Sequence, residues 1–249
     1  MLAERRRPSR LPDAAGCLEA SISSSRLGSP GEDRPHRASL SKLQSDGMPT
    51  PEATVVMRSV ASSPLGLRLA VQAIAAGQVV AYPTEAVYGL GCDPLDAVAV
   101  RRILAIKRRP ERKGLILIAA EFKALRPFVL PLEPARMAEI KTSWPGANTW
   151  LLPARPETPS WLTGEHETIA VRIPSHPVAR ALCKGWAGYG GGALVSTSAN
   201  IAERPPARTA LEVRRRLPQG PDLILNAPCG GHTRPSVIRD ARTGQVLRT

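Results

Sequence analysis

The sequence predicts an α/β domain, and three observations support this fold class. Apolar residues recur at helical spacing in several segments, as Leu67, Val71 and Ile74 do. Short runs rich in β-branched residues lie between those segments. The chain of 249 residues is 43% hydrophobic and 4% aromatic, so aliphatic side chains can fill a sizeable core. Strands and helices that alternate in this way are typical of α/β proteins.

The expected elements begin with a helix over residues 67–74, which Gly77 would end. A strand over residues 78–82 follows, and a loop leads on to a second helix. Asp93 and Pro94 are expected to provide the N-cap and the first-turn proline of that helix. The other expected elements are strands at 115–119, 168–173, 193–196, 223–225 and 237–238 and helices at 134–144, at 177–184 and around Val213.

Residues 1–56 differ from the rest of the chain in composition. They are rich in Ser, Pro, Gly and Arg, and their isolated apolar residues follow no period of 2 or 3.6. Three arginines at positions 5–7 precede no apolar stretch, so no signal peptide is expected. We therefore expect a disordered extension over residues 1–56 and one folded domain over residues 57–249.

The basic character belongs to the expected folded part. The chain has a net charge of +13, and residues 1–56 hold eight Lys or Arg against seven Asp or Glu. The remaining residues hold 26 against 14. Such a surplus attracts the phosphate groups of nucleotides, nucleic acids or both. The few aromatic residues argue against a domain that stacks nucleic-acid bases on a sheet.

Several other classes of protein are not expected. No stretch reaches the roughly 18 apolar residues that span a bilayer, so no membrane association is expected. The four cysteines form no CxxC pair, as is usual for reduced cysteines in a cytoplasmic protein. The four histidines lie far apart, so neither a metal site nor a catalytic histidine is expected. The chain has no GxGxxG, GxxxxGK[ST] or GxSxG motif.

Three segments hold candidate functional residues. The first is YPTEAVYGLGCDP at residues 82–94, where a glycine-containing loop joins a strand to a helix. Loops of this kind bind anions in α/β proteins, and Thr84 and Glu85 would offer a hydroxyl and a carboxylate. An ordinary connection between a strand and a helix would have the same pattern.

The second segment is KRRPERKG at residues 107–114, where five cations fall within seven residues. Cations at the end of a helix interact favourably with its dipole, so a solvated helix end is one interpretation. A triphosphate clamp is the other, because a lysine point charge and an arginine fork suit different phosphate oxygens.

The third segment is VSTSAN at residues 195–200, whose small hydroxyl and amide side chains follow a strand. It can hold a phosphate, a ribose or an amino-acid head group, or it can form a simple turn. Arg172 is a lone cation in an apolar strand, and it should meet a carboxylate or the anion of a ligand.

In this order, the segments resemble the YrdC-like family. Residues 82–94 are similar to its opening motif, and Lys107-x-Arg109 with Ser198-x-Asn200 is similar to its KxR…SxN signature. Residues 144–150, 170–174 and 234–236 match further family segments, and the likeness runs from about Leu65 to the end of the chain. The resemblance implies a twisted, mixed, open sheet with flanking helices around a deep, basic, concave site.

The resemblance also implies an activity. Members of the short, single-domain branch make threonylcarbamoyl-AMP and pyrophosphate from L-threonine, bicarbonate and ATP, with Mg²⁺ expected to accompany the nucleotide. Proteins of the tRNA-threonylcarbamoyl transferase complex then pass the threonylcarbamoyl group to adenosine 37 of tRNA. The roles implied are catalysis for Lys107, Arg109, Ser198 and Asn200, nucleotide binding for these four with Thr149, Arg234 and Ser236, and threonine binding for Thr84, Lys113, Arg172 and Ser196.

Two other functions stay open. One is binding of tRNA or another double-stranded RNA without synthase activity. The other is a YrdC-like domain with altered catalysis, such as a relative that uses carbamoyl phosphate. The sequence also departs from the family pattern at Ala147-Asn148, which we expect to loosen the loop that carries Thr149. The glycine-rich residues 186–192 are expected to form a flexible surface loop.

Overall fold

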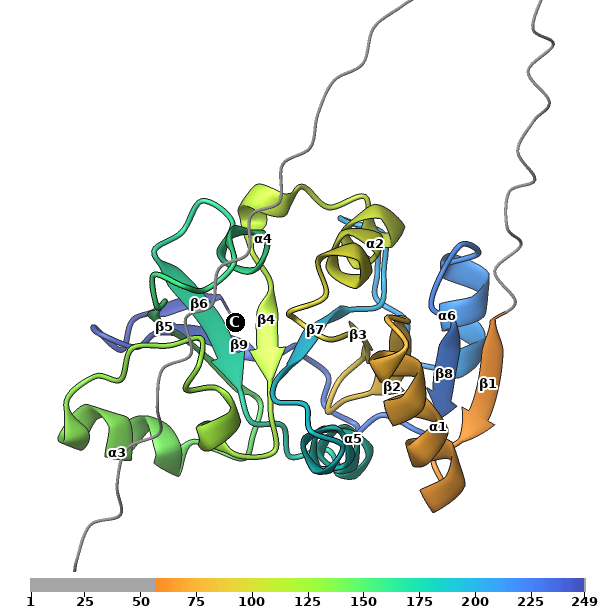
Figure 1. Cartoon of the computed structure of the whole chain (residues 1–249), viewed down its shortest axis with the longest axis horizontal. Helices are drawn as coiled ribbons and strands as arrows, with labels where there is room; N and C mark the ends of the chain where they lie inside the picture. The colour runs from red at the N-terminus through yellow and green to blue at the C-terminus, as the bar shows by residue number, and fades with distance from the viewer. Residues whose placement is uncertain (1–56, 249) are drawn as a thin grey trace, which may run out of the picture. The chain divides into compact units, whose positions relative to one another are not determined.

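The computed structural model describes residues 57–248, so the extension expected at residues 1–56 lies outside the described residues. Within the described part, strands and helices alternate as expected, and the strands join in one mixed sheet (Figure 1). The strands are β1 (Arg58–Ala61), β2 (Val80–Pro83), β3 (Tyr88–Gly91), β4 (Ile116–Ile118), β5 (Asn148–Pro153), β6 (Thr168–Arg172), β7 (Leu194–Ser198), β8 (Leu223–Asn226), β9 (Val237–Asp240) and β10 (Val246–Arg248).

Six α-helices and two short 3-10 helices accompany the sheet in residues 57–248. The helices α1 and α5 pack against each other, and α4 contacts the 3-10 helix η1. The helices are α1 (Pro64–Ala75), α2 (Ala97–Lys107), η1 (Glu111–Lys113), η2 (Phe122–Ala124), α3 (Pro134–Thr142), α4 (Ser160–Thr163), α5 (Pro177–Gly188) and α6 (Ala210–Arg216).

The strand order places distant segments side by side. It runs β1-β8-β2-β3-β7-β4-β6-β5-β9-β10, with parallel and antiparallel neighbours mixed. Strand β7 lies between β3 and β4, with Gly89 opposite Ser198 and Ile116 opposite Ser196. The three candidate segments of the sequence therefore meet near the centre of the sheet.

The sheet has a hydrophobic core on each face. Val79 and Ala81 pack in one cluster, whereas Val80 and Tyr82 pack in the other. Successive side chains of a strand point to opposite faces, so this alternation shows that β2 is covered on both sides. Helices α1 and α5 supply most of the helical side chains on the face of Tyr82.

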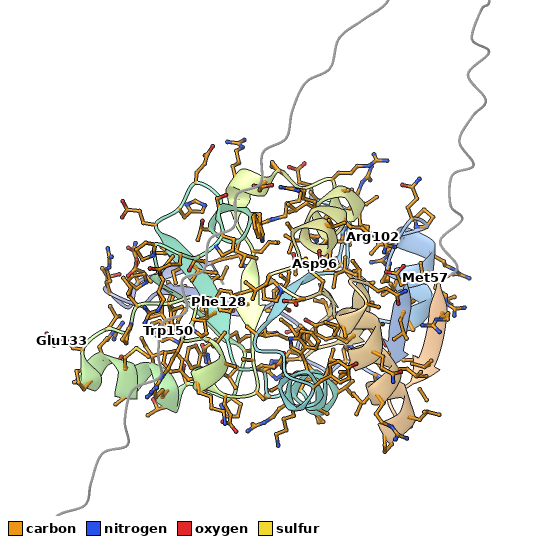
Figure 2. The ribbon with its side chains drawn as sticks, viewed as in Figure 1. Met57, Asp96, Arg102, Phe128, Glu133 and Trp150 are labelled. Atoms are coloured by element: carbon orange, nitrogen blue, oxygen red, sulfur yellow. The ribbon has the colours of Figure 1, made fainter. Side chains whose placement is uncertain are left out.

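Helix α2 begins three residues later than the sequence indicated. Its N-cap is Asp96, whose Oδ1 accepts hydrogen bonds from the backbone N–H groups of Val98 (2.9 Å) and Ala99 (3.0 Å). Asp93 instead accepts the N–H of Leu95 in the preceding turn. Both are good capping residues, and the helix that Asp96 caps buries Ala99, Val100, Ile103 and Leu104 in the core. Figure 2 shows Asp96 beside this helix.

Strand β3 forms where a loop was expected. Its residues Gly89 and Gly91 lie against the buried ring of Tyr82, and a Cβ added to Gly91 would come within 2.9 Å of that ring. Glycine is required by this close approach, rather than by a turn. Strands β1, β5 and β10 were also not expected, because they are short or interrupted by polar residues.

Two further expectations concern loops, and the first is wrong for residues 186–188, whereas residues 189–192 form a turn at the surface. Trp186 and Gly188 belong to helix α5, and the Trp186 Nε1–H donates to the carbonyl of Ala193, which fixes the following turn. Asn148 opens strand β5, and its carbonyl accepts the Trp144 Nε1–H at 2.8 Å. The segment that carries Thr149 is thus tied into the sheet. None of the helices in residues 57–248 has the length and apolar character needed to cross a membrane.

Candidate active site

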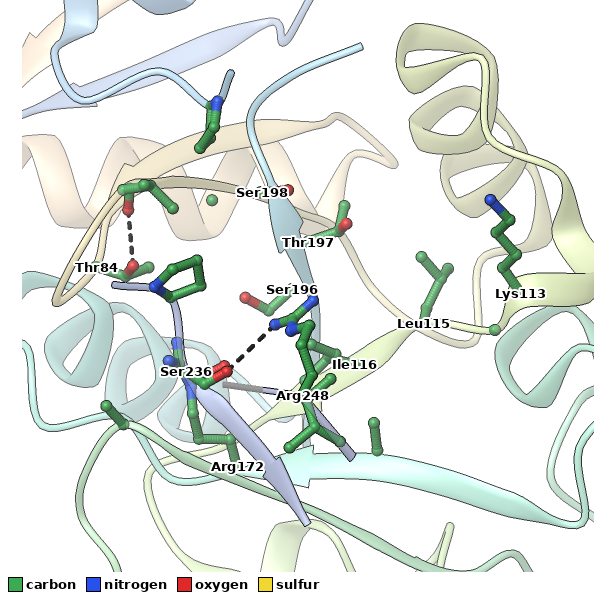
Figure 3. Close-up of a pocket in the computed structure, with 18 of the residues that line it drawn as sticks. Thr84, Lys113, Leu115, Ile116, Arg172, Ser196, Thr197, Ser198, Ser236 and Arg248 are labelled. Carbon is green, nitrogen blue, oxygen red and sulfur yellow. Dashed lines mark hydrogen bonds between the residues drawn. The ribbon is translucent and has the colours of Figure 1, made fainter. Parts of the chain in front are cut away.

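A cavity of about 540 Å³ opens where the candidate segments meet (Figure 3). Its walls come from the β2–β3 loop, the segment between α2 and β4, strands β6 and β7, and the C-terminal strands β9 and β10. Eight of the eleven expected site residues line it, namely Thr84, Arg109, Lys113, Arg172, Ser196, Ser198, Arg234 and Ser236. Lys107, Thr149 and Asn200 do not.

Hydroxyl groups line one side of the cavity. Thr84 and Ser196 are 5% and 6% exposed, so their hydroxyls lie deep in it. The Thr84 Oγ1–H donates to the carbonyl of Val87 at 2.7 Å, which leaves oxygen lone pairs for a ligand. Figure 3 shows Ser196 and Ser198 following each other along β7 above Arg172.

Arg109 approaches the cavity from the end of helix α2. Its Nη2 donates to the carbonyls of Lys113 (3.1 Å) and Gly114 (3.0 Å), and its Nε is buried without a hydrogen-bond partner. Burial and the nearby charge of Arg248 lower the pKa of Arg109. The guanidinium is therefore held by backbone carbonyls through Nη2, and its Nη1 has no hydrogen bond to the described residues, so a donor remains for an anion.

Lys113 lies on the side of the cavity away from Arg172, as Figure 3 shows. It is exposed to solvent and ends the 3-10 helix η1. Lys113 and Arg172 therefore lie at different ends of the cavity.

Arg172 meets a carboxylate, which was one of the two expected outcomes. Its Nη1 lies 3.3 Å from Oε2 of Glu85, and both side chains are buried. Oε1 of Glu85 accepts hydrogen bonds from the backbone N–H of Ser175 (2.7 Å) and of His176 (3.3 Å). Burial alone would raise the pKa of Glu85, but the charge of Arg172 and these donors outweigh it and hold that pKa below its ordinary value.

Lys107 lies behind the cavity wall and is 2% exposed. Its Nζ donates to the carbonyls of Ser198 and Asn200, the latter at 2.9 Å, and to Oδ1 of Asn200 at 3.0 Å. The Ser198 hydroxyl donates to the same Oδ1 at 2.6 Å. The KxR and SxN residues thus meet as expected, but Lys107 braces the loop of Ser198 and Asn200 and does not line the cavity. Burial and the charge of Arg109 lower the pKa of Lys107 to about 7.

Thr149 is also behind the wall. It is fully buried, and its Oγ1–H donates to Oγ of Ser236 at 3.0 Å, so it positions a residue that lines the cavity. Arg234 is exposed at the rim.

Three residues at the cavity were missed as site residues by reasoning from sequence. Glu85, His166 and Arg248 all line it. Glu85 was noted only as a loop carboxylate, although a buried arginine needs such a partner. His166 and Arg248 stand outside every motif, and no spacing in the sequence points to them.

The chemistry available is that of an anion-binding site. Cations and hydroxyls predominate among the polar groups, and Glu85 is the one carboxylate in the described lining. Among residues 57–248 no group of His, Cys, Asp and Glu side chains is arranged to hold a metal ion. The site can orient anionic reactants and neutralise charge that develops between them.

The fold and the site therefore define an α/β protein with a basic cavity suited to anionic ligands. Comparison with known proteins agrees with this class. The Sua5/YciO/YrdC family model, described as telomere recombination, matches residues 72–249. The chain belongs to this family, and its fold is the YrdC-like fold that the sequence predicted.

Individual relatives are similar over most of the described domain. The chain is 53% identical over 186 residues to the threonylcarbamoyl-AMP synthase of Halorhodospira halophila, covering 74% of this chain and 95% of the relative. It is 51% identical over 182 residues to that of Nitrosococcus oceani, covering 73% and 96%. The crystal structure of P. abyssi Sua5 complexed with L-threonine superposes with a TM-score of 0.67 at 30% identity. That match covers 74% of this chain but 54% of Sua5, so this chain spans about half of the Sua5 length.

Proposed function

We propose that this protein is a threonylcarbamoyl-AMP synthase that joins L-threonine, bicarbonate and ATP and releases pyrophosphate. One observation from the structure supports the proposal most strongly. The same cavity holds a buried arginine suited to a carboxylate and a separate arginine suited to phosphate. The names of the two relatives at 53% and 51% identity support the same activity.

Arg172 would bind the threonine carboxylate. The structure gives it the ion pair with Glu85 and no other polar partner among the described residues, so most of its five donors remain available. Thr84 and Ser196 also line the cavity, and their hydroxyls would meet the amino and hydroxyl groups of the substrate. The Sua5 structure with L-threonine supports a threonine site in this fold.

Arg109 would bind the polyphosphate of ATP, with Ser198, Lys113 and Arg234 around it. A cavity of about 540 Å³ is in the range that holds ligands of nucleotide size. Lys107 and Asn200 would shape the loop of Ser198 from behind, and Thr149 would do the same for Ser236. We thus propose positioning roles for the three expected residues that do not line the cavity.

The reaction needs little covalent chemistry from the protein. Threonine and bicarbonate give a carbamate and water, and the carbamate oxygen then attacks the α-phosphorus of ATP while the bond to pyrophosphate breaks. The cavity would hold the carbamate and the triphosphate in line, and Arg109 would offset the charge on the phosphate oxygens. No side chain serves as a nucleophile in this scheme.

Mg²⁺ would enter with the nucleotide. The lining has a single carboxylate, which pairs with Arg172, so the described residues offer no carboxylate cage. Mg²⁺ commonly keeps its waters and binds through substrate phosphates, and there it would offset triphosphate charge. The residues of the cavity therefore fit a Mg²⁺ ion that is bound by the phosphates of the substrate rather than by the protein.

We also propose that the adenylate passes in the cytoplasm to proteins of the tRNA-threonylcarbamoyl transferase complex. The described cysteines Cys92, Cys183 and Cys229 are free thiols, in keeping with a reducing compartment. Double-stranded RNA or tRNA binding without synthesis is the second candidate, and the charge surplus of the folded part favours it.

The first experiment is pyrophosphate release from ATP, Mg²⁺, bicarbonate and L-threonine by the purified full chain. We expect release that depends on threonine and falls sharply when serine replaces it. Arg109→Ala should lower the rate by about 100-fold or more, the scale for loss of one transition-state contact. Arg242→Ala, at an exposed position outside the cavity, is the matched control. Absence of release by a chain that binds tRNA would favour the RNA-binding function instead.

A further inference from the structure

Helix α2 presents an exposed face whose two halves differ in chemistry. Val98, Arg101, Ala105 and Arg108 recur at helical spacing and are all exposed, whereas the opposite stripe of the helix lies in the core. Leu95, in the turn before the helix, extends this stripe. We call these five residues the outer face of α2; the helix lies beside α4 (Figure 1). Its N-terminal half is apolar, and its C-terminal half is cationic.

The apolar half is held outward by its own hydrogen bonds. Leu95 is 64% exposed and Val98 is 75% exposed. The backbone N–H of Leu95 donates to Oδ1 of Asp93 at 2.9 Å, and the Trp161 Nε1–H donates to the carbonyl of Pro94 at 3.1 Å. A partner could therefore bury both apolar side chains without reordering the turn, and such preorganisation favours binding.

The cationic half borders a shallow groove with unbalanced charge. Neither Arg101 nor Arg108 forms an ion pair with any of residues 57–248. Glu111 is the one acidic residue in the described lining of the groove. The surplus of positive charge attracts carboxylates or phosphates. The lining residues are Arg101, Leu104, Ala105, Arg108, Arg109, Pro110 and Glu111.

Arg108 occupies a position that glycine usually takes. It ends α2 in the left-handed conformation, with a φ of 49° and a ψ of 44°. A Cβ atom makes this conformation unfavourable, which is why helices commonly end at glycine. An arginine at a strained position indicates that its side chain has a function there.

The composition of the outer face favours a protein partner over RNA. Phosphate groups could pair with the arginines, but they would leave Leu95 and Val98 in water. The outer face has no aromatic side chain on which bases could stack. A protein segment that carries both carboxylates and apolar side chains complements both halves.

The groove also adjoins the cavity, because Arg109 lines both. Under the proposed function the cavity releases threonylcarbamoyl-AMP, a mixed anhydride that water can hydrolyse. A partner that docks on α2 would lie beside the cavity that releases this product, so the product would travel a short distance through water.

We propose that the outer face of α2 is the docking surface for the protein that accepts the adenylate, and that this protein contributes a segment with acidic and apolar side chains. The identity of the partner rests on the proposed function. Its carboxylates would pair with Arg101 and Arg108, and its apolar side chains would cover Leu95 and Val98.

The test measures the Kd between the purified full chain and the purified tRNA-threonylcarbamoyl transferase complex of the same organism, by biolayer interferometry. The double variants Leu95→Ser/Val98→Ser and Arg101→Gln/Arg108→Gln should each raise this Kd about tenfold or more. The serine variant should leave the Kd of tRNA unchanged. Both variants should release pyrophosphate at the wild-type rate, because none of the four residues lines the cavity.

Leu211→Ser and Arg214→Gln/Arg215→Gln are the matched controls, because they make the same kinds of change at exposed positions of α6. They should leave the Kd of the complex unchanged. An unchanged Kd in either α2 variant would overturn the proposal, and so would equal losses in the α6 controls. A loss of tRNA affinity alone in Arg101→Gln/Arg108→Gln would also overturn it, because α2 would then bind RNA.

The failure of this proposal differs from that of the proposed function. A wild-type chain that releases pyrophosphate but does not bind the complex refutes the docking surface alone. A wild-type chain that binds the complex through α2 but releases no pyrophosphate refutes the proposed function alone.

Discussion

At the scale of single residues, Lys107 shows how a charged side chain can support a site without lining it. Its ammonium has four oxygen acceptors, all from residues 198 and 200, and no carboxylate partner in the described residues. Burial disfavours the charged form, whereas the acceptors favour it. The hydrogen bonds replace part of the lost hydration, and they hold the Ser198 loop in place.

The lowered pKa of Lys107 predicts a pH dependence of stability. The ordinary lysine pKa of 10.5 applies to the unfolded chain, and burial followed by the charge of Arg109 lowers it to about 7 in the folded chain. Between these values the unfolded state binds more protons, so stability rises with pH. The destabilisation from this group is complete below pH 7 and is relieved as the pH approaches 10.5.

Lys107→Met should remove this dependence while filling the same space. We expect the free energy of unfolding of the wild type, minus that of Lys107→Met, to increase between about pH 7 and pH 10. The gradient is up to about 1.4 kcal/mol per pH unit, measured by urea unfolding. Lys184→Met, at an exposed position of α5, should keep the wild-type gradient. Parallel curves for the wild type and Lys107→Met would contradict the lowered pKa.

At the scale of elements, the end of helix α5 shows why two nearby glycines should respond differently to substitution by alanine. A Cβ added to Gly191 would lie 2.0 Å from the Trp186 ring, whereas a Cβ added to Gly188 would meet nothing within 4 Å. The Trp186 ring is 6% exposed and stacks on Tyr189. The turn after α5 therefore requires glycine at position 191, because the Trp186 ring occupies the space of a side chain there.

Gly191→Ala should destabilise the protein by about 1–3 kcal/mol, because the Trp186 ring has to move out of a packed position. Gly188→Ala should stabilise it by up to about 1 kcal/mol, because alanine favours helix more than glycine does. The midpoints of urea unfolding measure both changes. Equal effects at the two positions would show that the packing of Trp186 does not control this turn.

At the scale of the whole described domain, the site depends on strands that are far apart in sequence. Arg109 follows α2, Arg172 ends β6 and Arg248 ends β10, so a ligand in the cavity should link the centre of the sheet to its β10 edge. Asp222, before β8, adds a further tie, because it accepts two hydrogen bonds from Arg102 of α2 and one from the backbone N–H of Val79. Figure 2 shows Arg102 on this helix.

ATP should therefore stabilise the fold as a unit. At a concentration of a hundred times its Kd, ATP should raise the free energy of unfolding by about 2.7 kcal/mol. For a domain of this size the thermal midpoint should increase by roughly 5–10 °C. At the same ATP concentration, Arg109→Ala should lose most of that increase. The same increase in both proteins would contradict binding of ATP at Arg109.

Reasoning from sequence reached the fold class and most of the lining. Helical periodicity located α1, α2 and α5, and the apolar runs located β4, β6 and β7. Strand β3 escaped prediction because its glycines are usual turn residues, and only the ring of Tyr82 explains them. The roles proposed for Thr84, Arg109, Arg172, Ser196 and Ser198 remain predictions that their shared cavity supports.

The sequence by itself determined the family, because ordered motifs over most of the chain are specific, and it determined that Arg172 needs an anionic partner. The tertiary structure alone decided that this partner is Glu85, that Lys107 faces Ser198 and Asn200 behind the wall, and that Arg248 enters the cavity. The physical reason is that burial and hydrogen-bond partners depend on which strands are neighbours. Here the order of the strands brings together residues about 90 positions apart in the sequence. No local sequence pattern predicts such contacts.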